Sequence, residues 1–283
     1  MKIGYLGPPG TFSEQALLES GEAAGAEVVP VPTVRETVLA VQEGAVDRAI
    51  VPIENSLEGT VNEAIDALVH EAPDVRIIGE SVLEVRQSLV TREPLDPGEI
   101  TAVYSHPQAL AQCAGTLREL VPQAESHPTA STAEAVRLVT GSSEPLAALA
   151  GPLSAELYGA HVVLENAGDS GGNATRFVWL GREGEVGGPG AGKTAIVFSG
   201  PGDDSPGWLV ECLSEFSSRG VNLTRIESRP SRLELGHYLF LVDVEGPAEA
   251  AGPTREAIEG LAGHCRQLRI LGSYPAGRRP GEG

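Results

Sequence analysis

The sequence predicts an α/β protein of two lobes followed by a smaller βαββαβ domain. Through the first 180 residues or so, short apolar runs alternate with helical patterns, as in parallel β-α units. A Gly-rich stretch without apolar periodicity follows, and beyond it the predicted order of strands and helices is that of a ferredoxin-like domain. We therefore expect a catalytic or ligand-binding domain over 1–182, a linker over 183–192, a second domain over 193–276 and a mobile tail over 277–283.

The first lobe begins with three buried strands, IGYLG, EVVPV and RAIVPI. The helices between and after them are FSEQALLES, TVRETVLAVQEG and VNEAIDALVH. A β-rich run from Arg76 to Thr91 is longer than one typical strand, so we expect it to cross between the lobes.

The second lobe opens with the strand TAVYS and the helix PQALAQCAGTLREL. A short strand near Ala124 and the helix STAEAVRLVTG follow, and then LSAELYGA, VVLENAG and TRFVWLG lead back to the first lobe. Ligands of open α/β sheets bind beyond the carboxyl ends of the strands, so a site is expected in a cleft between the lobes.

The second domain is expected to begin at the strand KTAIVFSG, followed by the helix PGWLVECLSEFSSRG. This helix has Leu209, Leu213 and Phe216 on one face and Gly220 at its end. The strands VNLTRIESRP and HYLFLVDVEG, the helix TREAIEGLAGHC and the strand CRQLRILGSYP complete the domain.

Composition and charge argue against several classes of protein. Twenty Lys and Arg against thirty-nine Asp and Glu give a net charge of −19, which disfavours nucleic-acid binding and anionic membrane surfaces. No apolar stretch has the length of a signal peptide or a membrane span, and the three cysteines lie far apart. We therefore expect a cytoplasmic protein with reduced thiols and without a metal site.

A match to the phosphate-loop pattern G-x-x-x-x-G-K-[ST] runs from Gly187 to Thr194. A phosphate loop must follow a strand and open a helix, so that the amino end of the helix faces the phosphates. Here the residues from Lys193 to Ser199 are themselves predicted to form a strand. A Gly-rich linker is the preferred interpretation, and a nucleotide hydrolase is the alternative that a titration with magnesium-ATP would test.

Three polar stretches follow predicted strands. In GPPGTFSEQA, Thr11 is a candidate substrate contact, and the alternative is a helix cap. In VPIENSLEGT, Glu54, Asn55 and Ser56 stand at a strand end, where a loop would also tolerate them. In YSHPQAL, His106 is more typical of a structural hydrogen-bonding group than of a base or ligand.

A fourth polar stretch, GGNATRFVWLG, places a hydroxyl and a guanidinium at the start of an apolar strand. Arg176 needs an anion there, and either a neighbouring carboxylate or a substrate carboxylate would supply it.

Taken in order, these stretches resemble the prephenate dehydratases. The resemblance runs through GPPGTFSEQA, VPIENSLEGTV, SHPQALAQC, STAEAV, LSAELYG and NATRF, and it covers almost the whole chain. It implies a two-lobed catalytic domain like that of periplasmic binding proteins, and a regulatory ACT domain most visible in GVNLTRIESRP. The family converts prephenate to phenylpyruvate, water and carbon dioxide, without a cofactor, and its members are homo-oligomers. We therefore expect a homodimer or a homotetramer.

The resemblance assigns the catalytic role to Thr175, whose hydroxyl would help the ring hydroxide to leave. It implies that Arg176 binds a substrate carboxylate, that Phe177 shapes the pocket, and that Asn55, Ser56 and Thr11 supply neutral donors. The Thr175 hydroxyl and the Arg176 guanidinium are expected to face one shared gap between the lobes.

The resemblance also implies feedback by phenylalanine through the ACT domain. The implied effector contacts come from two stretches of that domain: Gly207, Leu209, Asn222, Leu223, Glu227, Ser228 and Arg229. Where the family often has a small Ala, this chain has Trp208, whose indole would narrow, reshape or fill the effector pocket, or cover the domain interface.

Two alternatives stay open at this point. Arogenate, which carries an ammonium group, is an alternative substrate. A non-catalytic binding protein that senses an amino acid is an alternative function, because two-lobed α/β clefts also serve as solute receptors.

Overall fold

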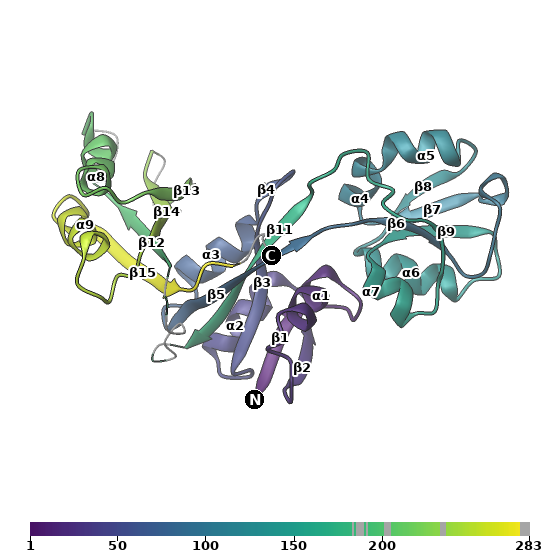
Figure 1. Cartoon of the computed structure of the whole chain (residues 1–283), viewed down its shortest axis with the longest axis horizontal. Helices are drawn as coiled ribbons and strands as arrows, with labels where there is room; N and C mark the ends of the chain where they lie inside the picture. The colour runs from purple at the N-terminus through teal and green to yellow at the C-terminus, as the bar shows by residue number, and fades with distance from the viewer. Residues whose placement is uncertain (183, 185–189, 191, 201–204, 233–235, 278–283) are drawn as a thin grey trace. The chain divides into compact units, whose positions relative to one another are not determined.

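The computed structural model describes residues 1–182, 184, 190, 192–200, 205–232 and 236–277 (Figure 1). Within these residues the chain forms two compact units. The first contains Met1–Ile65 and Val82–Phe177, and the second contains Asp66–Ser81 and the described residues between 178 and 277. The predicted linker and tail lie mostly outside the described residues.

The first sheet has the strand order β2-β1-β3-β11-β5, with β4 paired to β3. Its strands are β1 (Lys2–Leu6), β2 (Glu27–Val31), β3 (Arg48–Asn55), β4 (Gly59–Thr60), β5 (Val75–Glu84) and β11 (Ala174–Arg182). The helices are α1 (Phe12–Glu19), α2 (Val34–Gln42) and α3 (Asn62–His70). β1 is parallel to both β2 and β3, which confirms the predicted β-α units.

The second sheet has the order β10-β6-β9-β7-β8. Its strands are β6 (Ser88–Thr91), β7 (Ala102–Ser105), β8 (Glu125–Pro128), β9 (Leu146–Ala150) and β10 (His161–Leu164). The helices are α4 (Pro107–Gln112), α5 (Ala114–Leu120), α6 (Thr132–Thr140) and α7 (Pro152–Leu157), with a 3₁₀ turn η1 (Pro97–Glu99). β7 is parallel to β8 and β9, whereas β6 is antiparallel to β9 and β10, so this sheet is mixed.

Two elements of the second sheet differ from the prediction. The central strand β9 was not predicted, although every one of its five residues is buried. Its sequence LAALA lacks the β-branched and aromatic residues that mark strands. The predicted long helix is divided into α4 and α5 at Cys113, whose φ of −115° is outside the helical range.

The two lobes of the first unit meet at close backbone contacts. Ser154 on α7 donates a hydrogen bond to the carbonyl oxygen of Gly10 at 2.6 Å. A Cβ on Gly10 would lie 3.1 Å from the Ser154 hydroxyl, and φ there is +90°, so this position requires glycine. A Cβ on Gly151 would lie 2.7 Å from the ring of Phe12. These contacts explain why glycine stands at position 10 of the GPPGTFSEQA stretch and at position 151 before α7.

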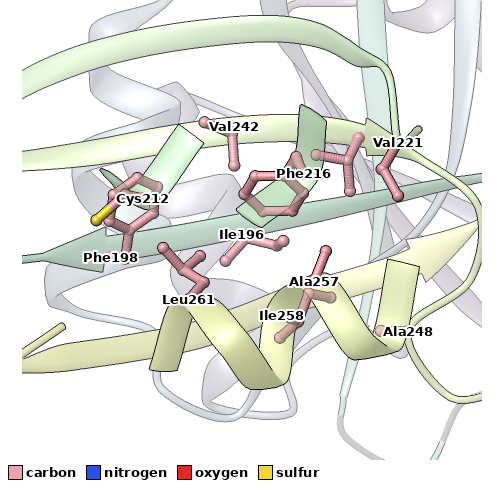
Figure 2. Packing of buried hydrophobic residues seen from close by; sticks show 11 residues of the cluster. Ile196, Phe198, Cys212, Phe216, Val221, Val242, Ala248, Ala257, Ile258 and Leu261 are labelled. Carbon is pink, nitrogen blue, oxygen red and sulfur yellow. The ribbon is translucent and has the colours of Figure 1, made fainter. Parts of the chain in front are cut away.

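The C-terminal region confirms the predicted βαββαβ order. It contains β12 (Lys193–Ser199), α8 (Trp208–Ser217), β13 (Leu223–Pro230), β14 (Tyr238–Glu245), α9 (Pro253–Ala262) and β15 (Gln267–Tyr274). Its antiparallel sheet has the order β13-β14-β12-β15. α8 and α9 contact each other and pack on this sheet. Figure 2 shows side chains of β12, α8 and α9 meeting in the core between them.

Trp208, at the start of α8, covers part of this core. Its indole N–H donates to the carbonyl oxygen of His264 at 2.6 Å, and its ring packs against Phe198 and Phe240 with centroids 6.0 and 5.8 Å apart. A Cβ on Gly200 would collide with the indole. The large side chain therefore has a structural role within this domain.

The segment that contains the end of α3 and most of β5 packs with the C-terminal sheet. Arg229 and Arg232 both bind the Asp66 carboxylate, at 2.9 and 2.6 Å. Arg269 donates to the carbonyl oxygens of Leu68, Ala72 and Val75 at 2.7–2.9 Å. These charge-assisted bonds hold residues 66–81 to the C-terminal sheet, so the second compact unit contains this segment as well as the chain that starts at Val178.

Lys193 and Thr194, the last two residues of the phosphate-loop match, make contacts within the fold. Lys193 lies in β12, and its ammonium group binds Glu80 at 2.7 Å. The Thr194 hydroxyl is fully buried and donates to the carbonyl oxygen of Gly246 at 2.7 Å. The predicted strand from Lys193 is confirmed, and residues 187–189 lie outside the described part of the chain. No helix among the described residues has both the length and the apolar character needed to cross a bilayer.

Candidate active site

Asn55, the last residue of β3, is the centre of a polar network. Its amide nitrogen donates to Asn173 Oδ1 at 2.8 Å and to Thr175 Oγ1 at 2.9 Å. Its amide oxygen accepts the backbone N–H groups of Leu57 and Glu58, both at 3.0 Å. Both ends of the amide are therefore engaged, and the orientation of the Asn55 side chain is fixed.

Thr175, the second residue of β11, is 8% exposed and receives its hydrogen bond from Asn55. Among the described residues no acceptor takes the hydrogen of its hydroxyl group. A hydroxyl whose oxygen already accepts a hydrogen bond is polarised toward donation. The hydrogen of the Thr175 hydroxyl is thus left without an acceptor in the described part of the chain.

Ser56 joins the loop after β3 to the residues that precede Thr175. Its hydroxyl donates to the carbonyl oxygen of Gly172 at 3.1 Å and accepts the N–H of Ala174 at 2.9 Å. Its own N–H donates to the carbonyl oxygen of Ala174 at 2.8 Å. The predicted site residue Ser56 therefore holds the start of β11 in position.

Asn173 extends the network to the second lobe. It donates to Gln112 Oε1 at 3.0 Å, and Gln112 in turn donates to Glu58 Oε1 at 3.3 Å. Neither Asn173 nor Gln112 was among the predicted site residues. Both were present in quoted motifs, as the Asn of NATRF and the last Gln of SHPQALAQC, but their roles depend on bonds between distant segments.

Thr175 and Arg176 do not face one shared gap, and this corrects the sequence-based expectation. Successive side chains of a strand point to opposite faces, and Arg176 pairs with Glu54 at 3.2 Å while Thr175 contacts the next residue, Asn55. The neighbouring carboxylate that the sequence left open as an alternative is therefore present. Phe177 lies on the same face as Thr175 and is almost fully buried.

Thr11 and His106 have the structural roles that the sequence left open. The Thr11 hydroxyl donates to the carbonyl oxygen of Leu6 at 2.7 Å and accepts the N–H of Glu14, so it caps α1. His106 Nδ1 accepts the N–H of Gln108 at 3.3 Å at the start of α4. Partial burial lowers the pKa of His106, which favours the neutral ring that this acceptor role requires.

A cavity of ≈ 530 Å³ lies against the Asn173 end of the network. It is lined by residues of four segments: Leu57, Glu84, Val85, Arg86, Gln87, Ala111, Gln112, Asn166, Gly168, Asp169, Ser170, Gly171, Gly172 and Asn173. Its volume is in the range of small-ligand sites. The loop that precedes Thr175 thus forms one wall of a cavity that can take a small substrate.

This loop is held to the second lobe, although its sequence, Asp-Ser-Gly-Gly, predicts flexibility. The Asp169 carboxylate accepts the backbone N–H groups of Gly115 and Thr116 at 2.7 and 2.8 Å, at the start of α5. These N–H groups hold the pKa of the Asp169 carboxyl below its usual range. The N–H of Ala167 also donates to the carbonyl oxygen of Gln87 at 2.7 Å.

The predicted effector residues of α8 and the start of β13 lie around the core of the C-terminal domain. Gly207 precedes α8 with φ of +87°, and Leu209 and Leu223 both pack against the core cluster. The Asn222 side chain donates to Glu245 Oε1 at 3.2 Å. A role for these residues in binding phenylalanine stays a prediction.

The predicted effector contacts Glu227, Ser228 and Arg229 are divided between the two faces of β13. Glu227 and Arg229 lie on the partly buried face, whereas Ser228 is exposed on the other. The Arg229 guanidinium binds both oxygens of Asp66, at 3.1 and 2.9 Å. This arginine therefore connects β13 to α3 within the second compact unit.

Comparison with known proteins agrees with the resemblance found in the sequence. The family model of prephenate dehydratase matches residues 3–185. A prephenate dehydratase of Lactococcus lactis subsp. cremoris is 38% identical over 279 residues, which cover 97% of each chain. A crystal structure of prephenate dehydratase from Arthrobacter aurescens in complex with L-Phe has a TM-score of 0.89 and 38% identity, covering 97% of this chain and 90% of that one. A structure described as a quorum quenching acylase has a TM-score of 0.86 and 31% identity, with 99% of each chain covered. With a family model over most of its length and relatives near 38% identity over nearly all of it, this chain belongs to the prephenate dehydratase family.

Proposed function

We propose that this protein converts prephenate to phenylpyruvate, water and carbon dioxide. The observation that carries the proposal is the Thr175 hydroxyl, which accepts from Asn55 and keeps its hydrogen for a ligand. The geometry of the site is needed to assign an activity, because one fold can support different activities.

The reaction balances without an added base. The ring carboxylate leaves as carbon dioxide, its bonding electrons enter the ring, and the ring hydroxyl leaves from the opposite carbon. Thr175 donates a hydrogen bond to this oxygen as negative charge develops on it, and one proton taken up from solvent converts the departing hydroxide to water, so the Thr175 hydroxyl group is intact at the end. Proton donation from a positioned group contributes about 10²–10⁴-fold to the rate.

The other predicted substrate contacts receive revised roles. Asn55 orients Thr175, and Ser56 fixes the start of β11. We assign Arg176 to the ion pair with Glu54 and Thr11 to the cap of α1. Phe177 supports Thr175 from within the core of the same face.

We expect phenylalanine to regulate the reaction through the C-terminal ACT domain. The solved relative in complex with L-Phe supports this expectation, because its fold covers nearly the whole of this chain. We also expect a cytoplasmic homodimer or homotetramer, as in the family.

A steady-state assay with the full chain tests the proposal. Phenylpyruvate formed from prephenate is followed by absorbance, with arogenate as the competing substrate and with or without phenylalanine. Thr175→Val should lower kcat at least about hundredfold with little change in prephenate binding, because the variant keeps the shape but loses the donor. Thr175→Ser, which keeps a hydroxyl group, should retain much of the activity. A parent protein inactive on prephenate, or a Thr175→Val variant at the parent rate, would refute the proposal.

A further inference from the structure

The proposed substrate carries two carboxylates, and among the described residues the hydrogen-bonded network of Asn55, Asn173 and Thr175 contains no Lys or Arg to bind them. Arg176 is paired with Glu54 on the opposite face of the sheet from Thr175. Among the residues that line the cavity beside the Thr175 network, Arg86 is the only Lys or Arg. A small dianion bound in this cavity would therefore meet one guanidinium group.

Arg86 stands between β5 and β6, where the chain passes from the first sheet to the second. Its guanidinium group contacts Glu84 at 2.7 Å, and its side chain is 59% exposed. Glu84 lines the same cavity. An exposed pair of this kind is worth little, so a substrate carboxylate can replace Glu84 at small cost.

The next residue, Gln87, supplies an independent observation. It is only 6% exposed, lines the same cavity, and its buried Oε1 has no hydrogen-bond partner among the described residues. Its backbone carbonyl oxygen accepts the N–H of Ala167, which fixes the residue in place. Buried polar atoms are nearly always paired, so an unpaired acceptor in a cavity wall indicates a ligand that donates.

We propose that Arg86 binds a carboxylate of the substrate and that Gln87 accepts a hydrogen bond from its ring hydroxyl. This inference rests on the proposed function. With both carboxyl groups ionised, the ring hydroxyl is the only hydrogen-bond donor of prephenate, so it is the group that suits the Gln87 oxygen. Arg86 suits a carboxylate because its fork of N–H groups matches two oxygens.

Steady-state kinetics on the full chain test the role of Arg86. Arg86→Gln should raise KM for prephenate about tenfold while kcat stays within about twofold, because the lost bond acts on binding. Glu84→Gln should lower KM, because it removes the anion that competes for Arg86. Arg92→Gln is the matched control: Arg92 is exposed, donates to the Ser142 carbonyl oxygen, and is not among the residues that line the cavity. Its KM should equal that of the parent.

The salt dependence of KM separates a charge effect from a structural one. The KM of the parent should rise with ionic strength more steeply than that of Arg86→Gln, since the variant lacks the screened attraction. Equal slopes, or an Arg86→Gln variant with the parent KM, would overturn the role of Arg86. Gln87→Leu tests the second contact and should lower kcat/KM about tenfold; an unchanged kcat/KM would overturn that role.

Binding without turnover distinguishes failure of this inference from failure of the proposed function. Calorimetric titration of prephenate into Thr175→Val and into Thr175→Val/Arg86→Gln should give a Kd about tenfold weaker in the double variant. Equal values would overturn the inference even when the parent turns over prephenate. An inactive parent would instead refute the proposed function.

Discussion

At the scale of single residues, the direction of one hydrogen bond decides the chemistry of the site. Asn55 donates to Thr175, so the threonine oxygen is the acceptor, and we propose that the hydrogen of the hydroxyl group binds the substrate. Asn55 is held in this orientation because two backbone N–H groups bind its oxygen. For this bond the Asn55 amide must stand beside the Thr175 hydroxyl, and Asn55 has that position because it is the last residue of β3.

Asn55→Asp is expected to lower kcat for prephenate about hundredfold or more. The new carboxylate keeps the two backbone bonds, but it accepts from Thr175 instead of donating, and this engages the hydrogen that the leaving hydroxide needs. Thermal unfolding and steady-state kinetics measure the two effects separately. Asn62→Asp makes the same change at an exposed position and should be neutral in both. Parent-like turnover of Asn55→Asp would contradict the role given to Asn55.

Several residues of the candidate site could be predicted from the sequence, but which of them bond to each other could not. Thr175, Asn55 and Ser56 were predicted, and all three share one network. Asn173 and Gln112 were missed because their bonds join positions 54 or more residues apart, which local patterns do not report. The alternation of a strand separates Arg176 from Thr175, so the pairing of Arg176 with Glu54, one of the two partners left open by the sequence, follows from β-strand geometry.

At the scale of elements, amino-acid composition failed to predict β9, a strand in which every residue is buried. β9 has the sequence LAALA and lies at the centre of its sheet with neighbours on both sides. A strand buried on both faces reads as an unbroken apolar run, and alanine leaves room for α6, which packs on β9. The strands and helices of the C-terminal domain were predicted in full because each has clear periodicity and a turn at its ends.

Asp169→Ala should lower the free energy of unfolding by about 1 kcal/mol at pH 7, since it removes the carboxylate that accepts two N–H groups of α5. The pKa of Asp169 is lowered in the folded state, so its contribution is present above the ordinary value of about 3.9 and is lost as pH falls through the folded value. The difference between parent and variant in urea unfolding should therefore shrink in acid.

Glu119→Ala, at an exposed position on the same helix, is the control for this measurement. It should change the free energy of unfolding by less than about 0.5 kcal/mol at either pH. A constant difference between Asp169→Ala and the parent from pH 7 to below 4 would show that the carboxylate charge does not contribute.

At the scale of the whole molecule, the second compact unit is assembled from two separate pieces of sequence. The piece 66–81 supplies Asp66 and Glu80, and the C-terminal piece supplies Arg229, Arg232 and Lys193, which bind them. α3 begins seven residues after Asn55, so a change in these contacts acts on a helix joined directly to the loop of the site.

Asp66→Ala should lower the free energy of unfolding by about 2 kcal/mol and weaken inhibition by phenylalanine. The Asp66 and Arg229 side chains are mostly buried, so removal of the acid leaves a guanidinium group poorly compensated. Glu22→Ala breaks an exposed pair with Arg48 and should cost less than about 1 kcal/mol. Urea unfolding and the phenylalanine concentration for half inhibition measure the two effects. A fully sensitive Asp66→Ala variant would rule out α3 as a link in regulation.

The two-piece unit also limits how regulatory modules can be exchanged among relatives. A chimaera joined at the glycine-rich segment would transplant Arg229 and Arg269 without the acid and the carbonyl groups that they bind. A graft that carries 66–81 along with the C-terminal piece would keep those partners together, so the useful crossover points lie inside the catalytic sequence and not only at its end.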